Sequence, residues 1–162
     1  MYRWEGSDQY TASWMDHDDV RRWLKEELFV GSVLNFPCGY SDLGDLRIDQ
    51  DPDVDPDHVL DLEDAPWDLP RFDTVYCDPP YGMYDTTSRD WVKALWDLAR
   101  ERLILQTPLH AIHLPSALKS WYIAESKPGS SGNRVTAFQV FDRPDAELGD
   151  FGIGDEVGGG SE

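Results

Sequence analysis

The sequence predicts an α/β protein with an open, mostly parallel sheet of seven strands and helices on both faces. Two observations predict this class. Short apolar segments alternate along the chain with helical or loop segments, which is typical of a mostly parallel sheet. The last two apolar segments are joined by the short, turn-rich segment 127–132, which indicates an antiparallel hairpin at one edge of that sheet.

The expected elements follow from apolar runs and from the residues that interrupt them. Pro, Gly and Asp follow the early apolar segments and end them, because proline cannot continue a strand ladder. The seven expected strands are 33–36, 46–49, 58–62, 72–77, 102–106, 121–125 and 134–141. Apolar side chains at helical spacing predict helices over 18–29 and 88–101, and a short helix is expected near 115–120.

Length and composition favour a single domain. The chain has 162 residues, and we expect one domain over 1–144, including an aromatic N-terminal arm over 1–17. The acidic, glycine-rich segment 145–162 is expected to be a disordered tail. Two cysteines exclude a disulfide-stapled secreted fold, and no apolar run is long enough to span a membrane. These features predict a cytoplasmic protein without a membrane partner.

The charge is strongly acidic, with 32 Asp and Glu against 14 Lys and Arg and a formal net charge of -18. One interpretation is repulsion of nucleic acids and anionic membranes. The other, which we favour, is adaptation to a salt-rich cytoplasm, because surface carboxylates keep a protein soluble there. In this respect the sequence resembles proteins of extreme halophiles. At about 1 M salt the Debye length is near 3 Å, so net charge does not exclude a nucleic-acid partner.

Polar residues gather where four of the expected strands end. These strand ends are Pro37-Cys38-Gly39, Asp49 to Asp51, Asp61 and Asp78-Pro79-Pro80-Tyr81. The carboxyl ends of parallel strands meet at one edge of a sheet, where ligands bind. The four ends therefore predict one site at that edge.

The motif Asp78-Pro79-Pro80-Tyr81 resembles the motif of S-adenosylmethionine-dependent amino-methyltransferases, which follows the fourth strand of a Rossmann-like class I methyltransferase sheet. An exocyclic amine conjugated to its ring is a poor nucleophile. The resemblance implies that the Asp78 carboxylate and the Pro79 carbonyl accept the two amine hydrogens. Pro79 and Pro80 would stiffen the loop, and Tyr81 would stack on the flipped base.

The same resemblance implies where S-adenosylmethionine binds. The first loop would comprise Asn35, Phe36, Pro37, Cys38 and Gly39. An acidic residue at the end of the second strand would hold the ribose, with Asp49 as first choice and Asp51 as second. Asp61 and Leu62 would face the adenine. Only six residues separate Gly39 from Leu46, so the usual first helix is expected to be absent or a single turn.

The resemblance implies adenine N6 in DNA as the methyl acceptor, because the first motif residue is Asp. The alternatives are RNA (guanine N2 or adenine N6), cytosine N4, small amines or proteins, and a catalytically silent accessory protein with the same fold. No segment of target-recognition size is present, so we expect a homodimer or a recognition partner. The compact organisation is similar to that of phage and archaeal-virus enzymes, including those of restriction–modification or viral self-protection.

Basic and aromatic residues after the motif are candidates for nucleic-acid contact. Arg89 and Lys93 would contact phosphates, as would basic residues of the helix over 18–29, and the loop containing Tyr84 would close over the base. No metal site is expected. His110 and His113 lack a third ligand, and the acidic run 49–57 lacks the spacing of a calcium loop.

Overall fold

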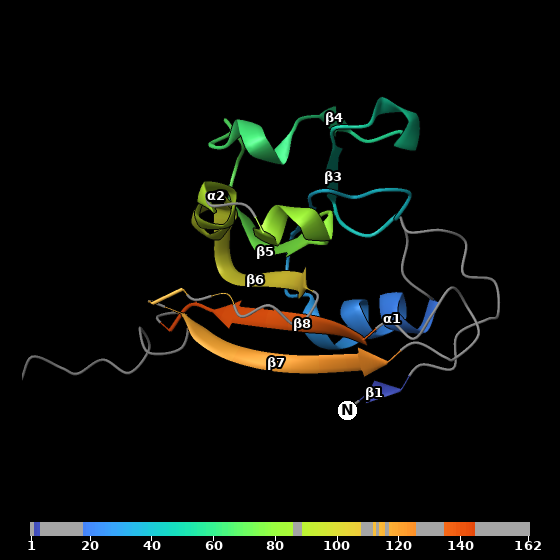
Figure 1. Ribbon diagram of the computed structural model, residues 1–162, viewed down its shortest axis with the longest axis vertical. Helices are drawn as coiled ribbons and strands as arrows, with labels where there is room; N and C mark the ends of the chain where they lie inside the picture. Colours follow the sequence, from blue (N-terminus) through green and yellow to red (C-terminus); the bar gives the residue numbers. More distant parts are fainter. Residues whose placement is uncertain are drawn as a thin grey trace, which may run out of the picture.

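The computed structural model describes residues 2–3, 18–85, 89–107, 112, 114–115, 117–125 and 135–144. Eight strands form one sheet with the order β1-β7-β8-β6-β5-β2-β3-β4 (Figure 1). The strands are β1 (Tyr2–Arg3), β2 (Val33–Asn35), β3 (Leu46–Asp49), β4 (His58–Val59), β5 (Phe72–Cys77), β6 (Ala99–Thr107), β7 (Leu118–Glu125) and β8 (Val135–Asp142).

The seven predicted strands are all present, and the predicted fold class is confirmed. β4, β3, β2, β5 and β6 run parallel to one another, whereas β8 runs antiparallel to both β6 and β7. β8 therefore makes the predicted edge hairpin with β7. The two-residue β1 adds an unpredicted parallel strand beyond β7.

Helices cover both faces of the sheet. α2 (Asp90–Leu98) packs on one face in a cluster that we call the α2 core, which includes Leu34, Phe36, Val75, Cys77, Leu103, Leu105, Trp91 and Leu95. α1 (Asp18–Trp23) and the π-helical turn η1 (Leu24–Leu28) pack on the other face. That second cluster, the α1 core, includes Val20, Trp23, Leu24, Leu28, Leu43, Tyr76, Ile104, Phe138 and Val140.

Successive residues of the central strands divide between these two cores. In β5, Val75 and Cys77 belong to the α2 core and Tyr76 to the α1 core. Side chains along a strand alternate between faces, so a strand buried on both faces is apolar throughout. Burial on both faces explains why the consecutive residues Val75, Tyr76 and Cys77 are all apolar.

Several predicted boundaries are wrong. The helix expected near 115–120 does not form, because Leu118 to Ser120 pair with Asp142 to Val140 of β8 and begin β7. The helix expected over 88–101 is α2 and ends at Leu98, and β6 begins at Ala99 rather than at Arg102. The helix expected over 18–29 continues from α1 into η1, where the Phe29 N–H donates to the Leu24 carbonyl at 2.8 Å.

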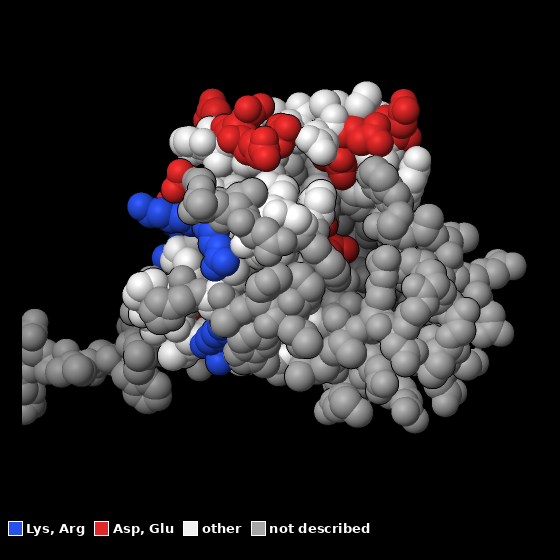
Figure 2. Space-filling view, in the orientation of Figure 1, with Lys and Arg blue, Asp and Glu red and all other residues white. Residues whose placement is uncertain are grey.

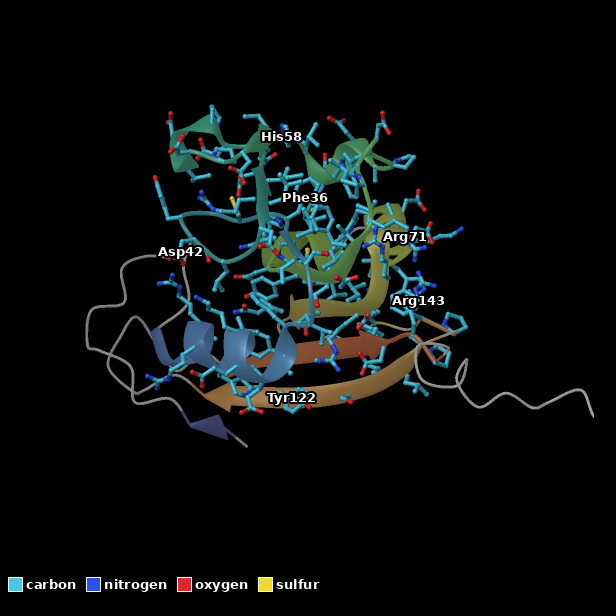
Figure 3. All side chains as sticks on the ribbon, turned by 180° about the vertical axis from the view of Figure 1, so that it is seen from behind. Phe36, Asp42, His58, Arg71, Tyr122 and Arg143 are labelled. Carbon is cyan, nitrogen blue, oxygen red and sulfur yellow. The ribbon has the colours of Figure 1, made fainter. Side chains whose placement is uncertain are left out.

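Two arginines end α2 where the sequence suggests no capping residue. Arg143 donates to the Trp96 carbonyl at 2.7 Å and to the Ala99 carbonyl at 3.0 Å. Arg71 also donates to the Ala99 carbonyl, and Figure 3 shows Arg71 and Arg143 at the same side of the sheet. Cations at a helix C-terminus satisfy its last carbonyls and oppose its dipole. These two arginines therefore fix α2 on its face of the sheet.

The expected N-terminal arm lies outside the described residues apart from Tyr2–Arg3, and the expected tail over 145–162 lies outside them entirely. In the described part of the chain, no helix combines the length and apolar character needed to cross a bilayer.

Candidate functional site

The predicted site lies where the strand order reverses. β2 is flanked by β3 on one side and by β5 on the other, so connections leave β2 and β5 in opposite directions. Asn35 is in register with Tyr76, and the Phe36 N–H donates to the Tyr76 carbonyl at 3.0 Å. This bond places the segment that follows β2 beside the Asp78-Pro79-Pro80 segment that follows β5. Ligands bind at such switch points in open α/β sheets.

Residues 40–45, between Gly39 and β3, contain no helix, in agreement with the sequence prediction. Instead, the Ser41 N–H donates to the Cys38 carbonyl at 3.1 Å, and Gly39 has a φ of 53°. A positive φ is strained for residues with a side chain, so glycine suits this tight turn.

Asp49 ties this turn to the end of β3. One oxygen of its carboxylate accepts the Gly39 N–H at 2.8 Å, and the other accepts the Asp51 N–H at 3.0 Å. Asp49 is 4% exposed. Asp49 therefore has a structural task that the sequence did not suggest. The predicted contact of Asp49 with a ribose stays a prediction.

Asp51 and Asp61 each begin a short 3-10 turn. The Asp51 carboxylate accepts the Asp53 N–H at the start of η2 (Pro52–Val54). The Asp61 carboxylate accepts the Glu63 N–H at the start of η3 (Leu62–Asp64). Both side chains are half-buried. Both remain predicted cofactor contacts.

Trp67 connects two segments of the candidate site, and the sequence analysis did not identify it. Its indole N–H donates to the Asp61 carbonyl at 2.7 Å, and its ring packs edge-on against Phe36 with centroids 4.9 Å apart. Trp67 thus joins the segment after β4 to the segment after β2. An aromatic residue in a Pro- and Asp-rich loop is the only signal for it in the sequence.

Three predicted cofactor residues have buried apolar or thiol side chains that offer a bound cofactor no polar contact. Phe36 and Leu62 belong to the α2 core, and Cys38 is buried beside Asp49. Their predicted contacts can therefore involve only backbone atoms. Burial raises the pKa of the Cys38 thiol to about 11, and the charge of Asp49 adds to this effect. The Cys38 thiol is consequently protonated at neutral pH and is a poor nucleophile.

Among the described residues of this edge, the Asn35 side chain has the one buried hydrogen-bond acceptor that lacks a partner. It is 1% exposed, and its side-chain N–H donates to the Leu43 carbonyl at 3.0 Å. Its side-chain oxygen has no hydrogen-bond partner. Buried polar atoms are normally paired, so an orphaned oxygen here is consistent with a ligand that supplies a donor.

The predicted catalytic motif leaves β5 as an extended segment and then forms the 3-10 turn η4 (Tyr81–Asp85). Asp78 is half-buried, Pro79 is buried and Pro80 is exposed. The Pro80 carbonyl accepts the Met83 N–H at 2.9 Å, which starts the turn. The Tyr81 side chain lies outside the described part of the structure, so its predicted stacking role stays a prediction.

The structure corrects the predicted role of Tyr84. It was predicted to contact nucleic acid, but its side chain is 1% exposed. Its hydroxyl donates to the Gln106 carbonyl at 3.0 Å, and its ring packs against Trp91. Tyr84 therefore anchors η4 to β6 and to α2, and it presents no surface to a base.

A buried polar network lies behind η4 at the end of β6, and the sequence gives no signal for it. The Tyr76 hydroxyl donates to the Gln106 side-chain oxygen at 2.7 Å, while the Gln139 amide donates to the Thr107 hydroxyl at 2.9 Å. The Ile112 N–H donates to the Gln139 side-chain oxygen at 3.0 Å. Paired groups of this kind fix the geometry of an edge.

Two other nucleic-acid candidates, which lie after the motif, are on the surface. Arg89 and Lys93 are exposed, and Arg89 donates to the Tyr84 carbonyl at 3.2 Å. Their contact with phosphates stays a prediction. In the described residues, no group of three or more metal-ligating side chains comes together.

No family model matches the sequence, and no curated protein matches it. Among solved structures, TrmN from Thermus thermophilus is similar over 76% of this chain and 47% of its own, with a TM-score of 0.58 and 16% identity. The chain therefore spans about half the length of TrmN. YhhF from Escherichia coli, which is named as a candidate methyltransferase, is similar over 78% of this chain and 85% of its own, with a TM-score of 0.52 and 14% identity.

The chain has the class I methyltransferase fold. The similarity to TrmN and YhhF agrees with the strand order of the sheet and with the switch point between β2 and β5. S-adenosylmethionine is the methyl donor associated with this fold, as predicted from the sequence. The orphaned oxygen of Asn35 and the tight turn at Gly39 fit such a ligand, because its methionine and nucleoside parts carry N–H and O–H donors.

Proposed function

We propose that this protein is an S-adenosylmethionine-dependent methyltransferase that modifies the exocyclic N6 of adenine in DNA. One observation carries the proposal. The Asp78-Pro79-Pro80-Tyr81 segment follows β5 directly beside the turn that follows β2, as the 3.0 Å bond between Phe36 and Tyr76 requires. An amine-binding motif and the cofactor turn thus adjoin at one edge of the sheet.

The cofactor is held by the turn after β2 and by the acidic residues that follow β3 and β4. In this proposal the Asn35 side-chain oxygen accepts a hydrogen bond from the cofactor, and the backbone of 36–39 surrounds it. Asp49 keeps that turn in place, Asp51 or Asp49 contacts the ribose, and Asp61 faces the adenine. When bound, S-adenosylmethionine supplies a methyl group on a positively charged sulfur.

The motif makes the amine nucleophilic. The Asp78 carboxylate accepts one amine hydrogen and the Pro79 carbonyl accepts the other, so the nitrogen lone pair is drawn out of conjugation with the ring. The same two acceptors would hold the nitrogen toward the methyl group that S-adenosylmethionine would supply. The nitrogen releases its proton to Asp78 and from there to water. Positioning provides most of the acceleration, and no covalent enzyme intermediate is required.

The experiment incubates the protein with labelled S-adenosylmethionine and with either DNA or RNA at high salt, followed by mass analysis of the nucleosides. We expect N6-methyladenine in DNA. Asp78→Ala should abolish methylation without unfolding the protein, whereas Asp68→Ala, an exposed acidic control, should retain it. Full activity of Asp78→Ala would refute the mechanism.

The alternative acceptor is RNA, at guanine N2 or adenine N6. It is favoured by the occurrence of the same four-residue motif in RNA methyltransferases of this fold. A methylated guanine or adenine in the RNA arm alone would replace our proposal with this one. N4-methylcytosine in DNA would keep the mechanism and change the base.

A silent accessory protein is the second alternative, and calorimetric titration with S-adenosylmethionine distinguishes it. The first loop has one glycine, Gly39, where related loops have more. Absence of binding at the working salt concentration would favour this alternative and remove the enzyme proposal.

We also propose a homodimer or a separate recognition partner in a salt-rich cytoplasm. Support comes from the charge of -18 and from the short connection between β5 and α2, which leaves little chain for reading a sequence. Light scattering across a range of salt concentrations, with and without DNA, tests the association state.

A further inference from the structure

Two tyrosines that flank the motif are tied to the same residue of β6. Tyr76 lies just before Asp78, and its hydroxyl donates to the Gln106 side-chain oxygen at 2.7 Å. Tyr84, in η4, follows the motif, and its hydroxyl donates to the Gln106 carbonyl at 3.0 Å. All three of these residues are at most 6% exposed. Gln106 therefore holds the chain on both sides of the motif.

Strand register places Gln106 beside the first residue of the motif. Cys77 is in register with Leu105 in the parallel pair of β5 and β6, so Asp78 and Gln106 follow at neighbouring strand ends. On its other side β6 pairs with β8, where Gln106 is in register with Phe138. Residues held within a sheet are more rigid supports than loop residues. The motif is thus fastened to the interior of the sheet rather than to another loop.

The proposed chemistry requires that the motif be held accurately. The Asp78 carboxylate and the Pro79 carbonyl each have to accept one hydrogen of the same amine. Proline restricts the φ angles of Pro79 and Pro80, but it does not fix how the whole segment lies relative to the sheet. A misplacement of about 1 Å can cost about a hundredfold in rate. Hydrogen bonds on both sides of the motif limit such a displacement.

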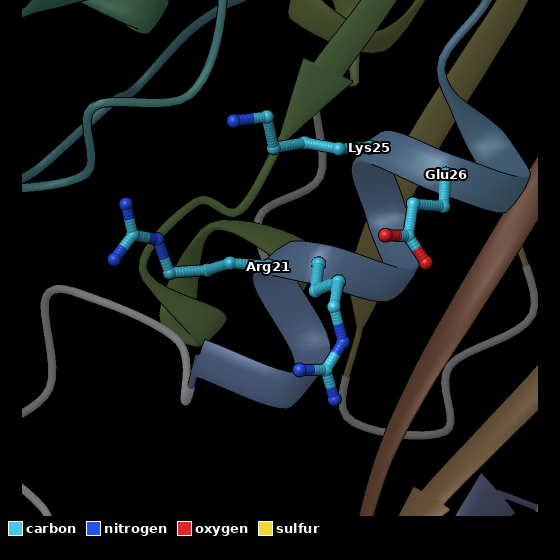
Figure 4. Close-up of a pocket in the computed structure, with 4 residues that line it drawn as sticks. Arg21, Lys25 and Glu26 are labelled. Carbon is cyan, nitrogen blue, oxygen red and sulfur yellow. The ribbon is translucent and has the colours of Figure 1, made fainter.

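The two bonds to Gln106 differ from the charged features of the surface in their response to salt. Figure 2 shows acidic side chains over the end of the molecule that carries β3, η2, β4 and η3. A depression of about 300 Å³ on α1 and η1 has a lining of both signs, which consists of Arg21, Arg22, Lys25 and Glu26 (Figure 4). Salt screens interactions between exposed charges, whereas the bonds to Gln106 join neutral groups in the interior. The support that Gln106 gives to the motif should therefore not vary with salt.

We infer that Gln106 is a positioning residue for methyl transfer. Through the hydroxyls of Tyr76 and Tyr84, it fixes the direction in which the motif presents its two acceptors to the amine. Gln106 acts through the two tyrosines rather than on the substrate. This inference rests on the proposed function and adds to it a residue that lies outside the motif and outside the predicted cofactor contacts.

The test compares steady-state methyl transfer by the wild type and Gln106→Met, with labelled S-adenosylmethionine and whichever of DNA and RNA the wild type methylates. Methionine has a similar length and no amide, so the bond from Tyr76 is lost and the main-chain carbonyl that Tyr84 uses is kept. We expect kcat to fall at least about fivefold at a temperature where circular dichroism shows both proteins folded. The Kd for S-adenosylmethionine, measured by calorimetry, should be unchanged, because the loss acts in the transition state. The ratio of the two kcat values should be the same at each salt concentration.

Two further variants test each bond separately. Tyr76→Phe removes the same bond from the other side, so Tyr76→Phe combined with Gln106→Met should have the kcat of Gln106→Met alone. Tyr84→Phe combined with Gln106→Met removes both bonds and should lower kcat below that of Gln106→Met. Losses from Tyr76→Phe and Gln106→Met that multiply in the combined variant would show that the two residues act independently, and would overturn the inference.

Thr74→Val is the matched control. Thr74 is buried in β5, the strand of Tyr76, and its hydroxyl donates to the Val30 carbonyl at 2.7 Å and accepts the Val30 N–H at 2.9 Å. This variant also loses buried hydrogen bonds and should be less stable, but it should keep the kcat of the wild type. An unchanged kcat for Gln106→Met, or an equal loss in Thr74→Val, would overturn the inference and leave the proposed function intact. A wild type that methylates neither DNA nor RNA would instead overturn the proposed function.

Discussion

Asp49→Asn should destabilise the protein through the cofactor turn. In the wild type, the two carboxylate oxygens accept the N–H groups of Gly39 and Asp51 at 2.8 and 3.0 Å, and the side chain is 4% exposed. The asparagine side chain keeps the shape but has one oxygen, and its NH2 group would face one of the two donors. One charge-assisted hydrogen bond is lost and a buried donor is left unpaired, at a cost of about 2–3 kcal/mol.

The assay is urea unfolding, followed by circular dichroism at several salt concentrations, with thermal unfolding beside it. For a chain of this length, the expected loss corresponds to a decrease in Tm of about 4–12 °C. Asp53→Asn is the control, because Asp53 is exposed and lies only four residues further on, and its effect should stay within about 0.5 kcal/mol. A free energy of unfolding for Asp49→Asn equal to that of the control would refute this reasoning.

Three further predictions concern individual side chains. Hydrogen bonds from the Ser32 backbone and hydroxyl hold the pKa of Asp73 below its usual value of 3.8. The ionised Asp73 carboxylate therefore stabilises the folded protein above pH 3.8, and this stabilisation is lost as the pH falls through the lowered pKa. Urea midpoints from neutral pH to about pH 3 should therefore fall less steeply for Asp73→Asn than for the wild type. The Cys38 thiol, with its pKa raised to about 11, should resist alkylation by iodoacetamide at neutral pH until denaturant is added. The Cys38→Ala variant should keep methyl-transfer activity. Loss of that activity with intact cofactor binding would show that the thiol has a role in the reaction. Tyr84→Phe removes the hydrogen bond to the Gln106 carbonyl and should lower the free energy of unfolding by about 1 kcal/mol, measured by urea unfolding. An unchanged urea midpoint would contradict the anchoring role of Tyr84.

The arrangement of the sheet could be predicted because its strands are buried on both faces. Segment 72–77 ends in the consecutive buried residues Val75, Tyr76 and Cys77, and Pro79 and Pro80 mark its end. The start of β7 could not be predicted in the same way. Leu118 and Lys119 are acceptable in a helix, and only their pairing with Asp142 and Phe141, far along the chain, makes them a strand. Local propensity carries no information about such partners.

The site could be predicted down to its strand ends but not to its internal bonds. The Asp78-Pro79 motif and the turn at Gly39 follow from residue types at strand termini. The task of Asp49 as a tie between turn and strand depends on geometry that forms only when β2 and β3 are paired. Tyr84 was misassigned for the same reason, since nothing near it in sequence reveals the carbonyl of Gln106.

The placement of α1 and η1 ahead of β2 has a practical consequence for expression. Because the connection between β2 and β3 has no helix, α1 and η1 cover Tyr76, Ile104, Phe138 and Val140 on that face of the sheet. Shortened variants that start after Phe29 would leave these side chains open to solvent, and large open apolar patches drive aggregation. An N-terminal truncation aimed at crystallisation should therefore stop well before Asp18.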